Sequence, residues 1–429
     1  MALVEPTAIR SSSPFEVLAL AERTLGFRPR ESLVVVSLRP PRWRSGLVAR
    51  ADLADAAAAV PDLVHHLRAD GAGRAFVVVA TDTGELPPAA APGRALAASV
   101  PVPRSGHRSA PGAAGPLPPA GRGDRRAHLP GADVAHLAAA ALREAGVRPE
   151  LWLVHRGRLH SYTCRRPCCP PEGLPVEEVD STRVAAEMVL AGRGLAGDRE
   201  EWEAAQRAAV APADAGAVAE VADLLELADR RWRRWERDGW AEPGDEPPVV
   251  ALELWRGLLE LGRGGVPVGP VGPGAGPEVG PGVGPEAAAV LLDALVRVPV
   301  RDAVLGSVVA EASLPCPFGC EADGGSDDCP LCPPPGAARV RTGAEQDDDA
   351  ATAVRVLQDL ARLAPPGRRA APLGCAAYVQ WSRGASAPAG VLAELALEDD
   401  PGHSLSGLVL QSVRLGVPPP SVREARRAG

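Results

Sequence analysis

Two stretches of low sequence complexity divide this chain of 429 residues into separate foldable parts. Residues 84–131 are rich in proline, glycine and alanine, and residues 262–285 repeat a Val-Gly-Pro theme. Neither stretch has enough apolar side chains to offset the entropy that a chain loses when it becomes ordered. A third such stretch is expected over residues 315–350. Cores must therefore form from the intervening segments, and we expect two domains, residues 1–180 and 181–429.

The first domain is expected to be a mixed α/β domain built in layers. Residues 33–38 and 75–80 are short, nearly continuous apolar runs between turn signals, which is the pattern of strands buried on both faces. Residues 46–52 are able to pair with the first of these strands. Helices are expected over residues 13–24, ahead of the first strand, over residues 56–69, between strands, and over residues 134–145, and together with the strands they predict a layered architecture.

Residues 151–163 predict a β-hairpin with the two-residue turn Arg156-Gly157. Because side chains alternate along a strand, His160, Tyr162 and Cys164 should share one face of its second strand. A proline-rich loop follows, in which Cys164 is succeeded by two more cysteines and an acidic residue. We take as the candidate functional motif Tyr162, Cys164, Cys168, Cys169 and Glu172.

Three interpretations of this first cysteine cluster remain open. The cysteines could bind a metal ion, with His160 or another histidine as a further ligand. One of them could instead be a reactive thiolate, activated by the charges of Arg165 and Arg166, with His160 as the base. In the third interpretation the thiols and prolines only pack a tight turn.

The second cysteine cluster is more specific. Cys316-Pro-Phe-Gly-Cys320 is followed, after eight residues, by Cys329-Pro-Leu-Cys332. Two short chelating loops in a polar, glycine-rich and aspartate-rich segment are typical of a structural zinc site with four thiolate ligands. Such a site is closed, and it would order a loop without catalysing a reaction.

The second domain is expected to be α-helical. An apolar stripe at helical spacing predicts that Trp232 and Trp235 are core residues and that the arginines between them are solvated, rather than a nucleic-acid surface. Residues 376–405 resemble a tetratricopeptide-type helical hairpin. Cys375 is expected to be a buried small hydrophobe, and His403 a cap or surface residue rather than a catalytic one.

Four parts of this chain carry a resemblance to a known family: Ser13-Pro-Phe-Glu-Val-Leu with Leu25-Gly-Phe-Arg-Pro-Arg-Glu-Ser, Ser161-Tyr-Thr-Cys with Cys168-Cys-Pro-Pro-Glu-Gly, Ala185-Ala-Glu-Met-Val-Leu-Ala-Gly, and Trp381-Ser-Arg-Gly with Asp400-Pro-Gly-His-Ser-Leu. With these segments the chain resembles the actinobacterial family DUF4192, a domain of unknown function. The resemblance implies a shared functional region near residues 25–32 and 162–173, but it implies no established activity. Residues 84–131 and 316–332 depart from the family pattern, the latter as an insertion.

A turn before the first strand offers one further candidate site. Arg28 and Arg30 could grip a phosphate or carboxylate, although Glu31 beside them favours an ordinary solvated turn.

Composition excludes several classes of function. The sequence contains no lysine, so Schiff-base enzymes and P-loop phosphate binding are excluded. A net charge of −8 and a pI near 5.6 argue against bulk binding to nucleic acid or to an anionic membrane. No apolar run is long enough to span a bilayer and the N-terminus lacks a secretory pattern, so a cytoplasmic location is expected.

These observations together favour a cytoplasmic binding or regulatory protein. It would carry structural zinc at the second cysteine cluster and contact a protein partner through its helical domain. The alternative is an enzyme that uses a thiolate or a metal ion at the first cysteine cluster.

Overall fold

The structure is a computed structural model that describes residues 13–87, 125–190, 194–239, 244–263, 283–309, 343–417 and 419. The chain divides into two compact units. The sheet unit comprises the described parts of Ala8–Thr24 and Pro29–Ala186, and the helical unit comprises those of Leu25–Arg28 and Glu187–Gly429. The cysteines of the second cluster lie outside the described residues.

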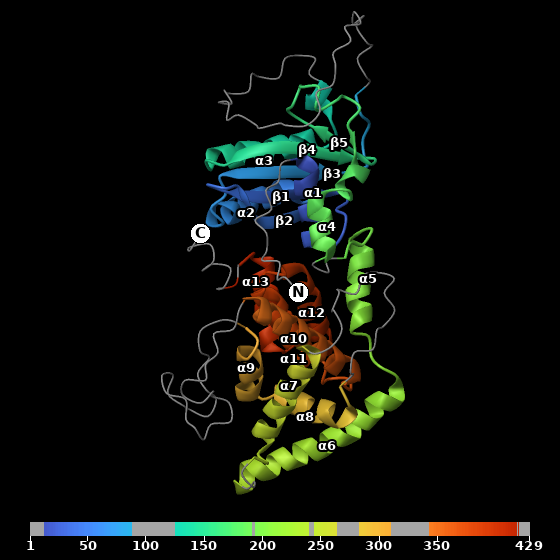
Figure 1. Ribbon diagram of the computed structural model, residues 1–429, viewed down its shortest axis with the longest axis vertical. Coiled ribbons are helices and arrows are strands. Elements are labelled where there is room, and N and C mark those ends of the chain that lie inside the picture. The colour runs from blue at the N-terminus through green and yellow to red at the C-terminus, as the bar shows by residue number, and fades with distance from the viewer. Residues whose placement is uncertain are drawn as a thin grey trace, which may run out of the picture. The chain divides into compact units, whose positions relative to one another are not determined.

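The sheet unit is built on a six-stranded sheet with the strand order β2-β1-β3-β4-β5-β6 (Figure 1). Strands β3 and β4 are parallel, and every other neighbouring pair is antiparallel. The strands are β1 (Ser32–Arg39), β2 (Arg44–Asp52), β3 (Arg74–Ala80), β4 (Arg148–His155), β5 (Arg158–Ser161) and β6 (Leu174–Pro175).

The expected layered α/β architecture is confirmed. Strands β1 and β3 are buried on both faces, since adjacent residues such as Val34 and Val35 are each at most 1% exposed. Two helices pack against each other and against one face of the sheet, where they close a core with β1, β3 and β4. The helices that begin in this unit are α1 (Pro14–Leu25), α2 (Ala56–Ala69), α3 (Ala132–Glu144) and α4 (Arg183–Leu190), and α2 and α3 are the pair on the sheet.

The predicted hairpin is formed by β4 and β5. Arg156 and Gly157 make its two-residue turn with φ angles of 48° and 73°, and such paired positive values match the twist of the flanking strands. His160 pairs with Leu153, which belongs to the core under α3. The side chains of His160 and Tyr162 therefore lie on the face of the sheet that α2 and α3 cover.

The low-complexity stretch assigned to residues 84–131 extends less far than expected. Its last residues form a short 3₁₀ helix, η1 (Arg125–His128), and then the N-terminus of α3. Leu129 is 8% exposed and joins the core, while the Pro130 carbonyl accepts a hydrogen bond from the Tyr162 hydroxyl. Burial of one apolar side chain and one tertiary hydrogen bond therefore order residues that composition alone places in a linker.

The helical unit is all-α in its described part. Its core draws side chains from most of its helices. The helices are α5 (Arg199–Ala209), α6 (Ala215–Asp238), α7 (Pro247–Arg263), α8 (Pro285–Leu295), α9 (Val298–Gly306), α10 (Gly343–Leu363), α11 (Ala370–Ser382), α12 (Ser386–Asp399) and α13 (Ser404–Arg414). None of the described helices in either unit is long and apolar enough to cross a membrane.

The tryptophans of α6 are core residues, as predicted. Trp232 is 5% exposed, and the Arg297 guanidinium stacks 4.0 Å from the centre of its ring. Trp235 packs against the same core. Three exposed arginines of α6, Arg230, Arg233 and Arg234, form ion pairs one turn away, as Arg233 does with Asp229 at 2.8 Å, so they lie on a solvated helix face.

The C-terminal helices differ from the expectation in two respects. Helix α10 begins at Gly343, and Asp349 is 1% exposed, so the third low-complexity stretch ends before residue 350. Helix α13 packs on both α11 and α12, which makes a three-helix arrangement rather than a two-helix repeat, and the tetratricopeptide-like hairpin is not confirmed. Cys375 is fully buried, as predicted, and His403 occupies the N-cap position of α13.

Candidate functional site

The first cysteine cluster lies in the loop between β5 and β6. At its start the Ser161 hydroxyl accepts hydrogen bonds from the backbone N–H groups of Thr163 and Cys164, at 3.3 and 2.9 Å. These bonds turn the chain away from the strand direction. At its end Gly173 adopts a φ of 78°, a conformation that glycine tolerates without strain, and the chain returns to the sheet as β6.

This loop brings three thiols together. The Cys168 sulfur lies 3.9 Å from the sulfurs of both Cys164 and Cys169, and all three sulfurs lie within 4.8 Å of one another. Cys168 is exposed, Cys164 is partly buried and Cys169 is buried. The spacing in the sequence therefore produces one compact cluster of sulfur donors that reaches the surface at Cys168.

The thiols differ in their acidity. Burial would raise the pKa of Cys164, but hydrogen bonds from the Arg166 backbone and from the other two thiols, together with the charge of Arg126, outweigh it and lower that pKa. Burial raises the pKa of Cys169 to about 12, and the neighbouring thiols add to this effect. Cys164 is therefore the more readily ionised of the two.

Arg126 is a site residue that the sequence did not reveal. Its guanidinium donates a hydrogen bond of 3.1 Å to the Cys169 carbonyl and adds positive charge beside the thiols. It lies in η1, inside the segment assigned to low complexity. Ser161 was not predicted as a site residue either, although serine hydroxyls often form turns by accepting hydrogen bonds from backbone N–H groups a few residues further along.

The other residues of the predicted motif, Tyr162 and Glu172, do not place ligand atoms beside the three thiols. Tyr162 is 4% exposed in the core and donates to the Pro130 carbonyl at 2.5 Å, and burial raises its pKa well above the usual range. The ring of His160, also 4% exposed, packs against Gly173. Glu172 is exposed, and among the described residues no carboxylate or imidazole belongs to the group of ligand atoms. The expected surface shared by a histidine, a phenol and a thiol is therefore not formed.

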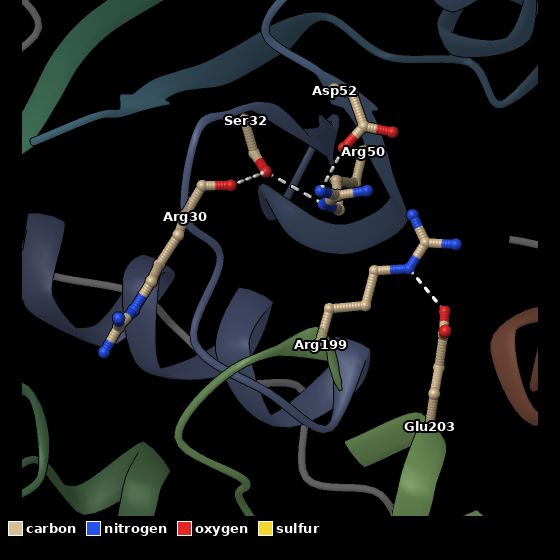
Figure 2. Close-up of polar contacts among 6 residues, drawn as sticks. All are labelled: Arg30, Ser32, Arg50, Asp52, Arg199 and Glu203. Carbon is tan, nitrogen blue, oxygen red and sulfur yellow. Dashed lines mark hydrogen bonds and ion pairs between the residues drawn. The ribbon is translucent and has the colours of Figure 1, made fainter. Parts of the chain in front are cut away.

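Several polar atoms of the turn before β1 form hydrogen bonds within the protein. The Ser32 hydroxyl donates to the Arg30 carbonyl and accepts from Arg50, while the Arg30 guanidinium points away from both (Figure 2). Glu31 has a φ of 39°, and its carboxylate accepts from the Thr81 hydroxyl at 2.8 Å. The Glu31 carboxylate therefore bonds donors that follow β3, and the anion-binding role of Arg28 and Arg30 stays a prediction.

The cysteines should differ in their rate of alkylation in metal-free protein. We expect iodoacetamide at pH 8 to modify Cys168 and Cys164 first, because they are accessible. Cys169 and Cys375 should react last, since each has a pKa raised to about 12 and therefore about one thiolate in ten thousand molecules at this pH. Time-resolved peptide mapping measures the order, and denatured protein is the control in which the differences should vanish. Modification of Cys169 as fast as Cys168 in the folded protein would contradict the burial described above.

Comparison with known proteins identifies a family. Residues 14–314 and 339–420 match the domain of unknown function DUF4192, so the match contains the three-thiol loop. It leaves out residues 315–338, which hold the second cysteine cluster, in agreement with an insertion there. A search of the curated proteins and a search of the solved structures each returned no match. Since the matched residues make up most of its length, the chain belongs to the DUF4192 family.

Proposed function

We propose that the sheet unit binds a thiophilic metal ion, zinc in the first instance, through Cys164, Cys168 and Cys169. The spacing of the sulfurs carries this proposal. Tetrahedral ligands at a Zn–S distance of about 2.3 Å lie about 3.8 Å from one another. The Cys168 sulfur is 3.9 Å from both of the others, so small side-chain adjustments bring all three into one coordination sphere.

The surroundings of the thiols suit three anionic ligands. A divalent ion with three thiolates carries a net charge of −1. Arg126 already acts electrostatically on Cys164, and the exposed Arg165 and Arg166 follow it directly in the loop. A backbone hydrogen bond from Arg166 to the Cys164 sulfur would help to fix this ligand, as outer hydrogen bonds do at metal sites.

The fourth coordination position would be open. No fourth ligand accompanies the three sulfurs in the described part of the chain, and Cys168 places the site at the surface. Three protein ligands with an exchangeable fourth position are typical of zinc sites that bind a further ligand, in contrast to closed structural sites. We therefore propose that the protein binds a metal ion and that this ion binds a further ligand or a partner at its open coordination position.

We also propose a second, closed zinc site at Cys316, Cys320, Cys329 and Cys332.

Metal content separates the two sites. In a chain with serine at the four positions of the second cluster, elemental mass spectrometry of untagged protein purified without chelators should give about one zinc ion per chain. Adding C164S, C168S and C169S should abolish this zinc. Adding C375A instead should leave it unchanged, because Cys375 is fully buried in the helical unit.

Two further results bear on the proposal. Far-UV circular dichroism should be unchanged in the triple variant, because the three thiols lie in a surface loop rather than in the main cores. Equal zinc content with and without the three cysteines, in folded protein, would refute the metal site. Zinc that is lost equally from the C375A control would show that binding depends on overall stability rather than on the thiols.

A further inference from the structure

The three thiols differ in what can reach them. Cys168 is exposed, Cys164 is partly buried, and Cys169 is 8% exposed. Backbone hydrogen bonds also hold Cys169 in place, because its N–H donates to the Arg166 carbonyl at 2.9 Å and its carbonyl accepts from Arg126 at 3.1 Å. A reagent from solution therefore meets Cys168 first, and of its two neighbouring thiols Cys164 is the more accessible.

We propose that Cys168 and Cys164 form a thiol–disulfide exchange pair that reacts with small disulfides bearing negative charge. The two sulfurs are 3.9 Å apart, and a disulfide bond of about 2.05 Å requires an approach of about 1.9 Å. The residues between them, 165–167, are exposed, so this approach meets no core packing. Disulfide formation does not depend on the proposed metal site. Only its consequence, release of the ion, rests on that proposed function.

The alternative pair, Cys168 with Cys169, is disfavoured by chain geometry. Adjacent residues have Cα atoms about 3.8 Å apart across a trans peptide, whereas disulfides need about 4.4–6.8 Å. A bond between neighbours would therefore strain the backbone that Arg126 and the Arg166 carbonyl hold. Cys169 should remain a thiol when the other two are oxidised.

Charge selects the class of substrate. Arg165 and Arg166 are exposed next to the reacting thiols, and Arg126 adds its charge from η1. The described part of the loop carries one acidic residue, Glu172. A disulfide with carboxylates would be attracted to this loop, and one with ammonium groups would be repelled.

The reaction proceeds by two exchanges. The Cys168 thiolate attacks one sulfur of the substrate, the substrate S–S bond breaks, and one substrate thiolate leaves and takes up a proton. The Cys164 thiolate then attacks the Cys168 sulfur of the mixed disulfide and displaces the second substrate thiolate. The protein loses two electrons and two protons, and the substrate disulfide is reduced to two thiols.

Peptide mapping tests the pairing in the metal-free full chain. Trypsin cleavage after Arg158 and Arg165 places Cys164 in peptide 159–165 and the other two cysteines in peptide 166–183. After incubation with oxidised glutathione and alkylation of the remaining thiols, we expect the two peptides to be linked through Cys168, with Cys169 alkylated. The C164S variant should accumulate glutathione on Cys168, and C169S should still form the link. A link through Cys169, or no link while all three thiols are still alkylated, would overturn the proposal.

The charge selection has its own control. Oxidised glutathione should react faster than cystamine by roughly an order of magnitude, the lower end of electrostatic effects on association. The double variant R165Q/R166Q should reduce this ratio, and equal rates in the wild-type chain would refute the assigned substrate class.

A separate measurement of the zinc content of the reduced protein distinguishes the exchange pair from the proposed metal site. Linkage without zinc binding would refute the metal site alone, and zinc binding without linkage in the metal-free chain would refute the exchange pair alone.

Discussion

Replacing Gly173 by alanine is expected to destabilise the sheet unit by about 2–5 kcal/mol. Its φ of 78° is unfavourable for a residue with a Cβ, which costs about 1–2 kcal/mol. The new Cβ would also lie 2.6 Å from Cε1 of His160, a buried ring with little room to move. Such overpacking costs about 1–3 kcal/mol more. The loop that carries the three thiols should lose its anchor.

Gly157 provides the matched control for this substitution. It has a φ of 73°, but its added Cβ would meet nothing within 4 Å. Gly157→Ala should therefore show the backbone penalty without the overlap, and the difference between the variants should be about 1–3 kcal/mol. Native-state hydrogen exchange over the β4–β5 hairpin reports on this unit alone. Equal protection in the two variants would mean that the His160 ring moves aside at no cost.

In the helical unit, Gly374→Ala is expected to cost about 2–4 kcal/mol. Gly374 lies inside α11, where its added Cβ would be 2.5 Å from Cε1 of His403 and 2.6 Å from Oγ of Ser406. Those two side chains share a hydrogen bond of 2.7 Å, and Ser406 is fully buried. Overpacking and loss of this bond outweigh the gain of about 1 kcal/mol in helix propensity.

Gly407→Ala in α13 isolates the propensity effect. Its Cβ would meet nothing within 4 Å, so this variant should be more stable than the wild type by up to about 1 kcal/mol. Hydrogen exchange over α11 and α13 measures both changes. If Gly374→Ala also stabilised the unit, the close packing of His403 and Ser406 on α11 would be wrong.

Local sequence predicted much of the fold because the local signals and the tertiary structure agree. The valine runs of β1 and β3 predicted strands buried on both faces, and the structure buries both. Gly157 between two apolar runs predicted a two-residue turn, because glycine adopts a positive φ angle without strain. Strand alternation also placed His160 and Tyr162 on one face. It could not show that this face is covered by α3, since alternation gives the side of a strand but not its neighbours.

The site was predicted only in part for a similar reason. The spacing of the cysteines allows the three sulfurs to meet, but their separation depends on where the loop starts and ends, which Ser161 and Gly173 decide. Arg126 could not be found from composition, because its neighbourhood is ordered by Leu129 in a core that the sequence assigns to other segments. Tertiary contacts of single residues carry no periodic signal.

The parallel pairing of β3 with β4 has a consequence for the order in which the sheet unit folds. β1 with β2 and β4 with β5 are hairpins that close over a few residues, whereas β3 and β4 pair only after residues 81–147 have been brought into a loop. Loop closure must be completed before such a contact adds any stability, so this step should limit the folding rate. Its cost grows slowly with length, by about 0.6 kcal/mol for each doubling. Insertions or deletions between residues 87 and 125 should therefore change the stability of the sheet unit little, provided that Arg126, Leu129 and α3 keep their contacts.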